Sequence, residues 1–253
     1  MPGVIDTNIE QGVLTLRMNR PSKKNALTDA MYHALADAME SAETNDDVRA
    51  VVLMGAGGDF TTGNDIADFL AAATGQSGPD AGKGVGRFLR AQIEISLPFI
   101  AAVDGLAVGV GATTLFQCDL VYASTRADIR TPFVDLGVVS ENASSLLAPR
   151  IMGHQRAFQM LCLGDKFSGQ DAYDAGLVAK LCAPEDVEAL AIDAARRLAA
   201  KPPGALKATR DLLRGDLEAI RERSALENKL FGECLQSDEA RAAFSAFMTR
   251  KAG

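Results

Sequence analysis

Two short, almost entirely apolar segments, each followed at once by glycine-rich sequence, constrain this chain most. Arg49–Met54 leads into Gly55–Gly58, and Pro98–Val103, about 49 positions later, leads into Gly105–Gly111. Apolar runs of this length are typical of strands that are covered on both faces, as in a parallel sheet packed between helices. Because the same strand, loop and helix order occurs twice, the sequence predicts an α/β fold with a repeated unit.

The remaining periodicities predict the elements around this repeat. Apolar residues at helical spacing predict a helix from Thr28 to Thr44 with Thr28 as its N-cap, and a small-residue stretch at Ala73–Gly86 predicts a mobile loop. Further elements are expected as a hairpin at Val4–Ile9 and Val13–Met18, short strands at Leu120–Ala123, Asp128–Arg130 and Leu177–Leu181, and helices at Glu141–Ile151, His154–Leu163, Gly169–Ala175 and Pro184–Ala200. The sequence Lys201–Gly204, with its two prolines, predicts a boundary, and amphipathic helix follows it.

Charge and hydropathy exclude several kinds of partner. The chain has 26 Lys and Arg against 33 Asp and Glu, a formal net charge of −7, so a nucleic-acid partner is not expected. The most apolar stretch, Pro98–Phe116, is interrupted by Asp104 and glycines, so no membrane span is expected. Residues 1–10 do not resemble a secretory signal, and the last four residues are not a peroxisomal address. We therefore expect a cytoplasmic protein.

Few residues suit metal or nucleophilic chemistry. His33 falls within a predicted helix and His154 near a helix start, and neither is expected to act as a base. The cysteines lack a C-x-x-C pair and are expected to be buried small hydrophobes in a reducing compartment, not metal ligands: Cys118, Cys162, Cys182 and Cys234. The glycine loops match neither a dinucleotide fingerprint nor a P-loop. Each leaves free backbone N–H groups at a predicted helix start, which suit an oxyanion, although tight turns alone would also require these glycines.

Three segments appear in a familiar order: Asn19–Leu27, Val51–Ile66 and Pro98–Ser124. In this order they resemble the crotonase superfamily, also called the enoyl-CoA hydratase/isomerase family, and the resemblance extends from about Asn19 to Lys180. It implies a spiral of β-β-α turns in residues 1–200, followed by a helical oligomerisation region in residues 201–253. It also implies a homotrimer or dimer of trimers, an acyl-CoA substrate, and no cofactor other than the coenzyme A of the substrate itself.

The resemblance also assigns roles to single residues. The backbone N–H groups of Asn64 and Val110 would form the oxyanion hole. Hydratases of the family carry two glutamates at positions that hold Thr113 and Phe133 here, so efficient hydration is not expected, because neither side chain can transfer a proton as a carboxylate does.

A further segment, Arg130–Ser145, resembles the peroxisomal-type Δ3,Δ2-enoyl-CoA isomerases, with their Thr-Pro-Phe and Glu-x-x-Ser-Ser pattern. In that branch the glutamate before the Ser-Ser pair is the base, which makes Glu141 the candidate here. A helix N-cap at Ser140 with a first-turn acid is the structural alternative for the same residues. Substrate contacts are implied for Lys24, Ala26, Asp65, Ile66, Phe69, Gly109, Phe133 and Leu136. Lys24 would contact a CoA phosphate, and Phe69, Leu70, Phe88 and Phe133 would surround the acyl chain.

Two alternatives to the isomerase stay open at this point. One is another acyl-CoA reaction on the same scaffold, such as hydration or dienoyl isomerisation, with Asp65 as the acid. The other is a CoA-binding or RNA-binding protein without catalysis, and the acidic charge disfavours the RNA version.

Overall fold

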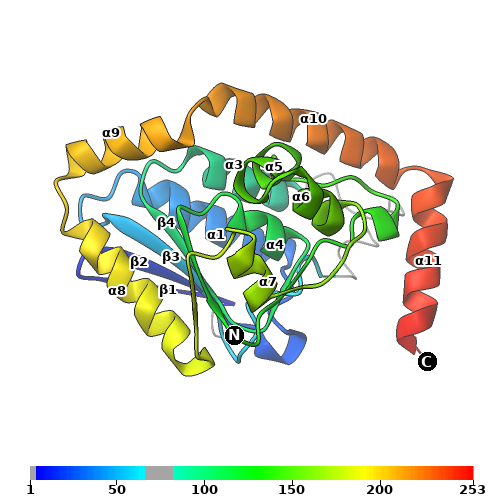
Figure 1. Ribbon diagram of the computed structural model, residues 1–253, viewed down its shortest axis with the longest axis horizontal. Coiled ribbons are helices and arrows are strands. Elements are labelled where there is room, and N and C mark those ends of the chain that lie inside the picture. The colour runs from blue at the N-terminus through cyan, green and yellow to red at the C-terminus, as the bar shows by residue number, and fades with distance from the viewer. Residues whose placement is uncertain (1–3, 66–81, 253) are drawn as a thin grey trace.

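Two β-sheets and a series of helices make up the fold in the computed structural model, which describes residues 4–65 and 82–252 (Figure 1). The larger sheet has the order β1-β2-β3-β4-β6-β9, in which β1 and β2 form an antiparallel hairpin and every other pairing is parallel. Its strands are β1 (Ile5–Glu10), β2 (Val13–Met18), β3 (Ala50–Gly55), β4 (Phe99–Val103), β6 (Leu120–Ser124) and β9 (Lys180–Cys182). The smaller sheet contains β5 (Leu106–Val108), β7 (Asp128–Arg130) and β8 (Phe167–Ser168). The predicted α/β class is confirmed.

Helices cover both faces of the larger sheet because its central strands are apolar on both faces. On β3, Val52 and Met54 pack under helix α8, whereas Val51 and Leu53 face the larger core with α1. The helices and 3₁₀ turns are η1 (Pro21–Lys23), α1 (Asp29–Ala42), α3 (Lys83–Glu94), α4 (Val110–Leu115), η2 (Val134–Leu136), α5 (Ser144–Met152), α6 (His154–Leu161), α7 (Gly169–Asp174), η3 (Pro184–Asp186), α8 (Val187–Ala199), α9 (Pro203–Arg214), α10 (Leu217–Leu235) and α11 (Asp238–Ala252).

The last three helices follow the predicted boundary. In Figure 1, α9 and α10 run one after the other along one edge of the molecule, and α11 turns at the end of α10 and runs down the neighbouring edge to the C-terminus. Arg210 fixes α9 to the segments that lead into β4 and β6: its side chain is buried, pairs with Asp119 at 2.7 Å and donates to the Ile95 carbonyl at 2.7 Å. Within the part of the chain that the structure describes, no helix is long and apolar enough to cross a membrane.

Several sequence expectations are confirmed, and others need correction. The hairpin and the helix capped by Thr28 are present, and the Thr28 hydroxyl accepts from Met31 N. The loop expected over Ala73–Gly86 ends earlier, because α3 begins at Lys83; its residues 73–81 lie outside the described part. Strand β5, inside the second glycine loop, was not predicted. Cys162 is exposed and not buried, and the other three cysteines are half-buried.

Candidate active site

The loop after β3 is held in place by one buried side chain, Asn25. Asn25 has a φ of 56° and is fully buried. Its side-chain Nδ2 donates to the Ala56 and Asp59 carbonyls at 2.8 and 2.7 Å. The backbone carbonyl of Asn25 accepts from Thr61 Oγ1 at 2.7 Å. Asparagine tolerates this left-handed backbone better than most residues. Asn25 therefore fixes the path of the first glycine loop.

The two glycine loops lie directly against each other. Thr61 N donates to the Leu106 carbonyl at 2.8 Å, and Val108 N donates to the Thr61 carbonyl at 3.0 Å. Gly63 has a φ of +83°, and a Cβ there would lie 2.7 Å from the Val108 carbonyl oxygen. Only glycine allows this backbone approach, so Gly63 is required where the loops meet.

This contact leaves two candidate oxyanion donors on neighbouring loops. Leu27 N donates to the Gly63 carbonyl and Asp65 N donates to the Leu27 carbonyl, so the N–H of Asn64, between them, points away from Leu27. Val110 is the first residue of α4, where a backbone N–H has no partner within the helix. Gly109, just before it, has φ 59° and ψ −118°, a conformation that favours glycine. Among the described residues, neither N–H has a hydrogen-bond acceptor.

Glu141 lies in a turn before α5 and not in the first turn of a helix. The helix expected from Glu141 begins only at Ser144, because Asn142 and Ala143 have φ values of 62° and 57°. These left-handed residues interrupt the α-helical backbone. The interpretation of Ser140 as an N-cap with Glu141 as a first-turn acid is therefore wrong.

The Glu141 carboxyl is buried, and its pKa lies near neutral pH. Its side chain is 5% exposed, and Oε1 has no hydrogen-bond partner among the described residues. Burial raises the pKa of Glu141 to about 7, the charge of Glu227 adds to this rise, and a hydrogen bond with the Thr113 side chain opposes it. Thr113 lies on α4, three residues after Val110, so Glu141 faces the second glycine loop.

Tyr32 binds the side chain of Asn64 in the first glycine loop and senses the charge of Glu141. The buried Tyr32 hydroxyl donates a short hydrogen bond to Asn64 Oδ1. Burial raises the pKa of Tyr32 well above its usual range, and the negative charges of Glu141 and Asp29 raise it further. The hydroxyl therefore stays protonated, and Asn64, Tyr32 and Glu141 lie in one neighbourhood.

The polar residues expected to contact substrate differ in their surroundings. Asp65 forms an ion pair with Arg20 at 2.6 Å, and Arg20 also donates to the Ala26 carbonyl at 3.0 Å. Asp65 therefore has a structural partner. Lys24 is exposed, and its carbonyl accepts from Thr62 N, so its side chain lies at the surface beside the first loop.

The apolar residues expected around the acyl chain are only partly brought together. Phe133 and Leu136 pack against a cluster that contains Ala240 and Phe231 from the last two helices. Phe88 is buried in the main core, in ring contact with Tyr32. Ile66, Phe69 and Leu70 lie outside the described residues. Phe133 therefore lies beside the C-terminal helices α10 and α11, a contact that the sequence did not indicate.

Four residues near Glu141 were not predicted from the sequence: Asn142, Gln92, Gln117 and Glu227. Asn142 is fully buried and joins Gln92 and Gln117 by hydrogen bonds, and Glu227 accepts from Ser145. Glu227 follows Ile220 by seven residues, two helical turns, which places it on the buried stripe of α10. An acid on an apolar stripe is a signal that could have identified it.

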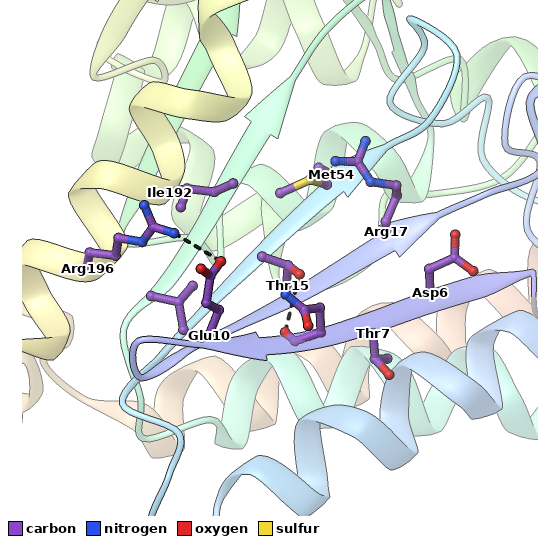
Figure 2. A pocket seen from close by; sticks show the side chains of 10 residues that line it. Asp6, Thr7, Glu10, Thr15, Arg17, Met54, Ile192 and Arg196 are labelled. Carbon is purple, nitrogen blue, oxygen red and sulfur yellow. Dashed lines mark hydrogen bonds and ion pairs between the residues drawn. The ribbon is translucent and has the colours of Figure 1, made fainter.

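A hollow of about 300 Å³ lies on the face of the larger sheet that α8 covers (Figure 2). It is lined by the β1-β2 hairpin and α8, and the ion pair between Arg196 and Glu10, at 3.1 Å, crosses it. None of the loop residues described above lines it. This hollow is therefore separate from the candidate active site.

Residues 8–252 match the family described as Enoyl-CoA hydratase/isomerase. Enoyl-CoA delta isomerase 2 of Rattus norvegicus is 35% identical over 98% of this chain, which spans 64% of that relative's length. The mitochondrial enoyl-CoA hydratase of Pongo abelii is 30% identical over 93% of this chain and 81% of its own. Isomerases and hydratases are thus both among the relatives.

The fold matches solved structures closely. The crystal structure of an enoyl-CoA hydratase/isomerase from Pseudoalteromonas atlantica has a TM-score of 0.93 and 36% identity, and the match covers 98% of both chains. Such agreement over nearly the whole length identifies the fold as that of the crotonase superfamily.

Proposed function

Because this chain belongs to the enoyl-CoA hydratase/isomerase family, we propose that it is a Δ3,Δ2-enoyl-CoA isomerase. The reaction moves the double bond of a 3-enoyl-CoA into conjugation with the thioester and gives a 2-enoyl-CoA. Coenzyme A enters as part of the substrate, and the reaction as proposed uses no other cofactor. A 1,3-proton transfer of this kind needs one group that first accepts and then donates the same proton.

Glu141 is the proposed base. Its ionised carboxylate takes a proton from C2, the electrons move into the thioester carbonyl, and the resulting enolate oxygen accepts hydrogen bonds from the Asn64 and Val110 N–H groups. Glu141 then returns the proton to C4, and the thioester carbonyl is restored. Loss of one donor of this type costs about 2.7–4 kcal/mol of transition-state stabilisation.

A single observation carries this proposal: Glu141 is a buried carboxyl beside Thr113 of α4, its pKa is raised to about 7, and its Oε1 has no hydrogen-bond partner among the described residues. A base whose pKa lies close to the working pH both takes and releases a proton readily. At the two positions where hydratases of the family carry glutamates, this chain has Thr113 and Phe133. One carboxylate supports isomerisation better than hydration.

Ultraviolet absorbance tests the proposal, because conjugation raises the absorbance of the thioester and hydration lowers it. We expect a rise with a 3-enoyl-CoA that is lost in Glu141→Gln, and no fall with a 2-enoyl-CoA. A fall with the 2-enoyl substrate would favour a hydratase, and tight acyl-CoA binding without any change would favour a protein without catalysis. If Glu141→Gln keeps activity and Asp65→Asn loses it, Asp65 and not Glu141 is the catalytic acid.

The C-terminal helices are proposed to join copies of the chain into a trimer or a dimer of trimers. Leu212 and Leu213 on α9 are 82% and 83% exposed, and Leu226 and Leu230 on α10 are also exposed. Apolar surface of this extent is typical of an interface. Sedimentation equilibrium of the whole chain tests this, and a monomer at micromolar concentration would contradict it.

A further inference from the structure

A second buried carboxylate, Glu227 of α10, lies behind the candidate base. Its side chain is 4% exposed. Oε1 accepts from Ser145 N at 2.9 Å and from Ser145 Oγ at 2.5 Å. Oε2 is buried and has no hydrogen-bond partner among the described residues. A buried acid that is only half satisfied is costly, so a structural explanation alone is incomplete.

Glu227 holds the segment that carries Glu141. Ser145 is the second residue of α5, and Ser144 N, just before it, donates to the Glu141 carbonyl at 3.1 Å. The hydrogen bonds from Ser145 to Glu227 therefore fix the first turn of α5, and through it the turn that carries Glu141. The connection spans 82 residues of sequence between Ser145 and Glu227.

The charged and titratable groups around this pair come from three helices, α10, α6 and α1. Arg223, on the same helix as Glu227, donates to Ser145 Oγ at 3.1 Å. His154 of α6 lines the same groove of about 440 Å³ as Glu227 and Arg223. Tyr32 of α1 faces Glu141 on the other side. Arg223 is the cation that offsets the charge of Glu227, and its contact is to the serine and not to Oε2.

We propose that Glu227 is a positioning residue for Glu141: it aims that carboxyl through its hydrogen bonds with Ser145, and its own charge acts on the same carboxyl. This inference rests on the proposed isomerase function, for which Glu141 is the base. Two carboxylates that share a poorly solvated site repel each other when both are ionised. When Glu141 takes the proton from C2 this repulsion is relieved, and when the proton goes to C4 it returns. Burial raises the pKa of Glu227, and the hydrogen bonds from Ser145 and the charge of Arg223 oppose this rise. In this proposal Glu227 stays ionised while Glu141 exchanges the proton.

Titration of the labelled carboxyl carbons of glutamate by ¹³C NMR tests the proposal without turnover. The resonance absent from Glu141→Gln identifies Glu141, and the one absent from Glu227→Gln identifies Glu227. We expect the midpoint of Glu141 to fall in Glu227→Gln and to stay unchanged in Glu222→Gln, the matched control, whose side chain is exposed on the same helix. An unchanged Glu141 midpoint in Glu227→Gln overturns the proposal.

A second variant covers the case in which Glu227→Gln does not fold. Arg223 offsets the charge of Glu227, so Arg223→Gln should raise the midpoint of Glu141 above its wild-type value. The absence of this shift also overturns the proposal. Neither result depends on enzyme activity, so a protein without isomerase activity would disprove the proposed function and leave this test decisive.

Kinetics separate the two parts of the role. Glu227→Gln keeps an acceptor for Ser145, so the acid limb of the kcat/KM profile should move to lower pH. Glu227→Ala also removes the acceptor, so kcat should fall a further roughly 10–100-fold with KM nearly unchanged. Equal kcat and equal pH profiles for wild type, Glu227→Gln and Glu227→Ala would leave Glu227 without either role.

Discussion

Asn142 Nδ2 donates to Gln92 Oε1 at 2.9 Å, and the Asn142 carbonyl accepts from Gln117 Nε2 at 2.7 Å. These bonds join the residue after Glu141 to α3 and to the segment after α4. Asn142 also has a φ of 62°, which asparagine tolerates. The turn that carries Glu141 is thus fixed by a buried polar network.

Asn142→Ala is expected to lower the free energy of unfolding by about 2–3 kcal/mol, because Gln92 Oε1 loses its donor in a buried site and alanine disfavours the left-handed backbone. Urea denaturation measures this change. Asn142→Gly is the matched control, since glycine accepts the backbone but makes no side-chain bond. Equal stability of the glycine variant and the wild type would show that the network contributes little.

The raised pKa of Glu141 predicts a pH-dependent cost in stability. In the unfolded chain this carboxyl ionises with its ordinary pKa of 4.5, and in the folded protein with a pKa of about 7. Between these values the folded state holds a proton that the unfolded state has released, so stability falls as pH rises. A shift of this size corresponds to roughly 3 kcal/mol.

Glu141→Gln should therefore be more stable than wild type at pH 8, by up to roughly 3 kcal/mol, and no more stable at pH 4. Chemical denaturation at the two pH values measures the difference, with Glu222→Gln as the control. A difference that is the same at both pH values would show that the Glu141 pKa is not raised by folding.

Gly63→Ala is expected to reduce kcat by about 10²–10³-fold, because the new Cβ would press on the Val108 carbonyl and turn the Asn64 N–H away from the enolate oxygen. Gly86→Ala is the control: it lies in α3 with no atom within 4 Å of the added Cβ. The control should keep full activity and gain about 0.5–1 kcal/mol of stability. Steady-state kinetics with a 3-enoyl-CoA would contradict the oxyanion role if Gly63→Ala retained wild-type kcat.

Tyr32→Phe removes the hydrogen bond to Asn64 Oδ1 and leaves the ring in the core. We expect a loss of about 1 kcal/mol in stability and a several-fold lower kcat, because the first loop is held less firmly. Tyr173→Phe, at a tyrosine that is 47% exposed, should change neither quantity. Wild-type kcat in Tyr32→Phe would assign the tyrosine to stability alone.

Local patterns predicted most of the elements correctly. The hairpin, strands β3 and β4 and the cap at Thr28 depend on neighbouring residues, and all four are observed. The helix start at Glu141 was wrong because the polar contacts of Asn142 with Gln92 and Gln117 stabilise a left-handed turn that propensity disfavours. Strand β5 was missed because its three residues pair with β7 and with Thr61, which lie far away in sequence.

The sequence by itself determined the two buried strands, the glycines that allow the loops to meet, and the presence of a glutamate before Ser144 and Ser145. Only the tertiary structure decided the proton affinity and the orientation of that glutamate. Its proton affinity depends on burial and on the charge of Glu227, and its direction depends on hydrogen bonds from Asn142 and Ser145. Solvation and charge act through space between residues from distant segments, and no local pattern in a sequence records them.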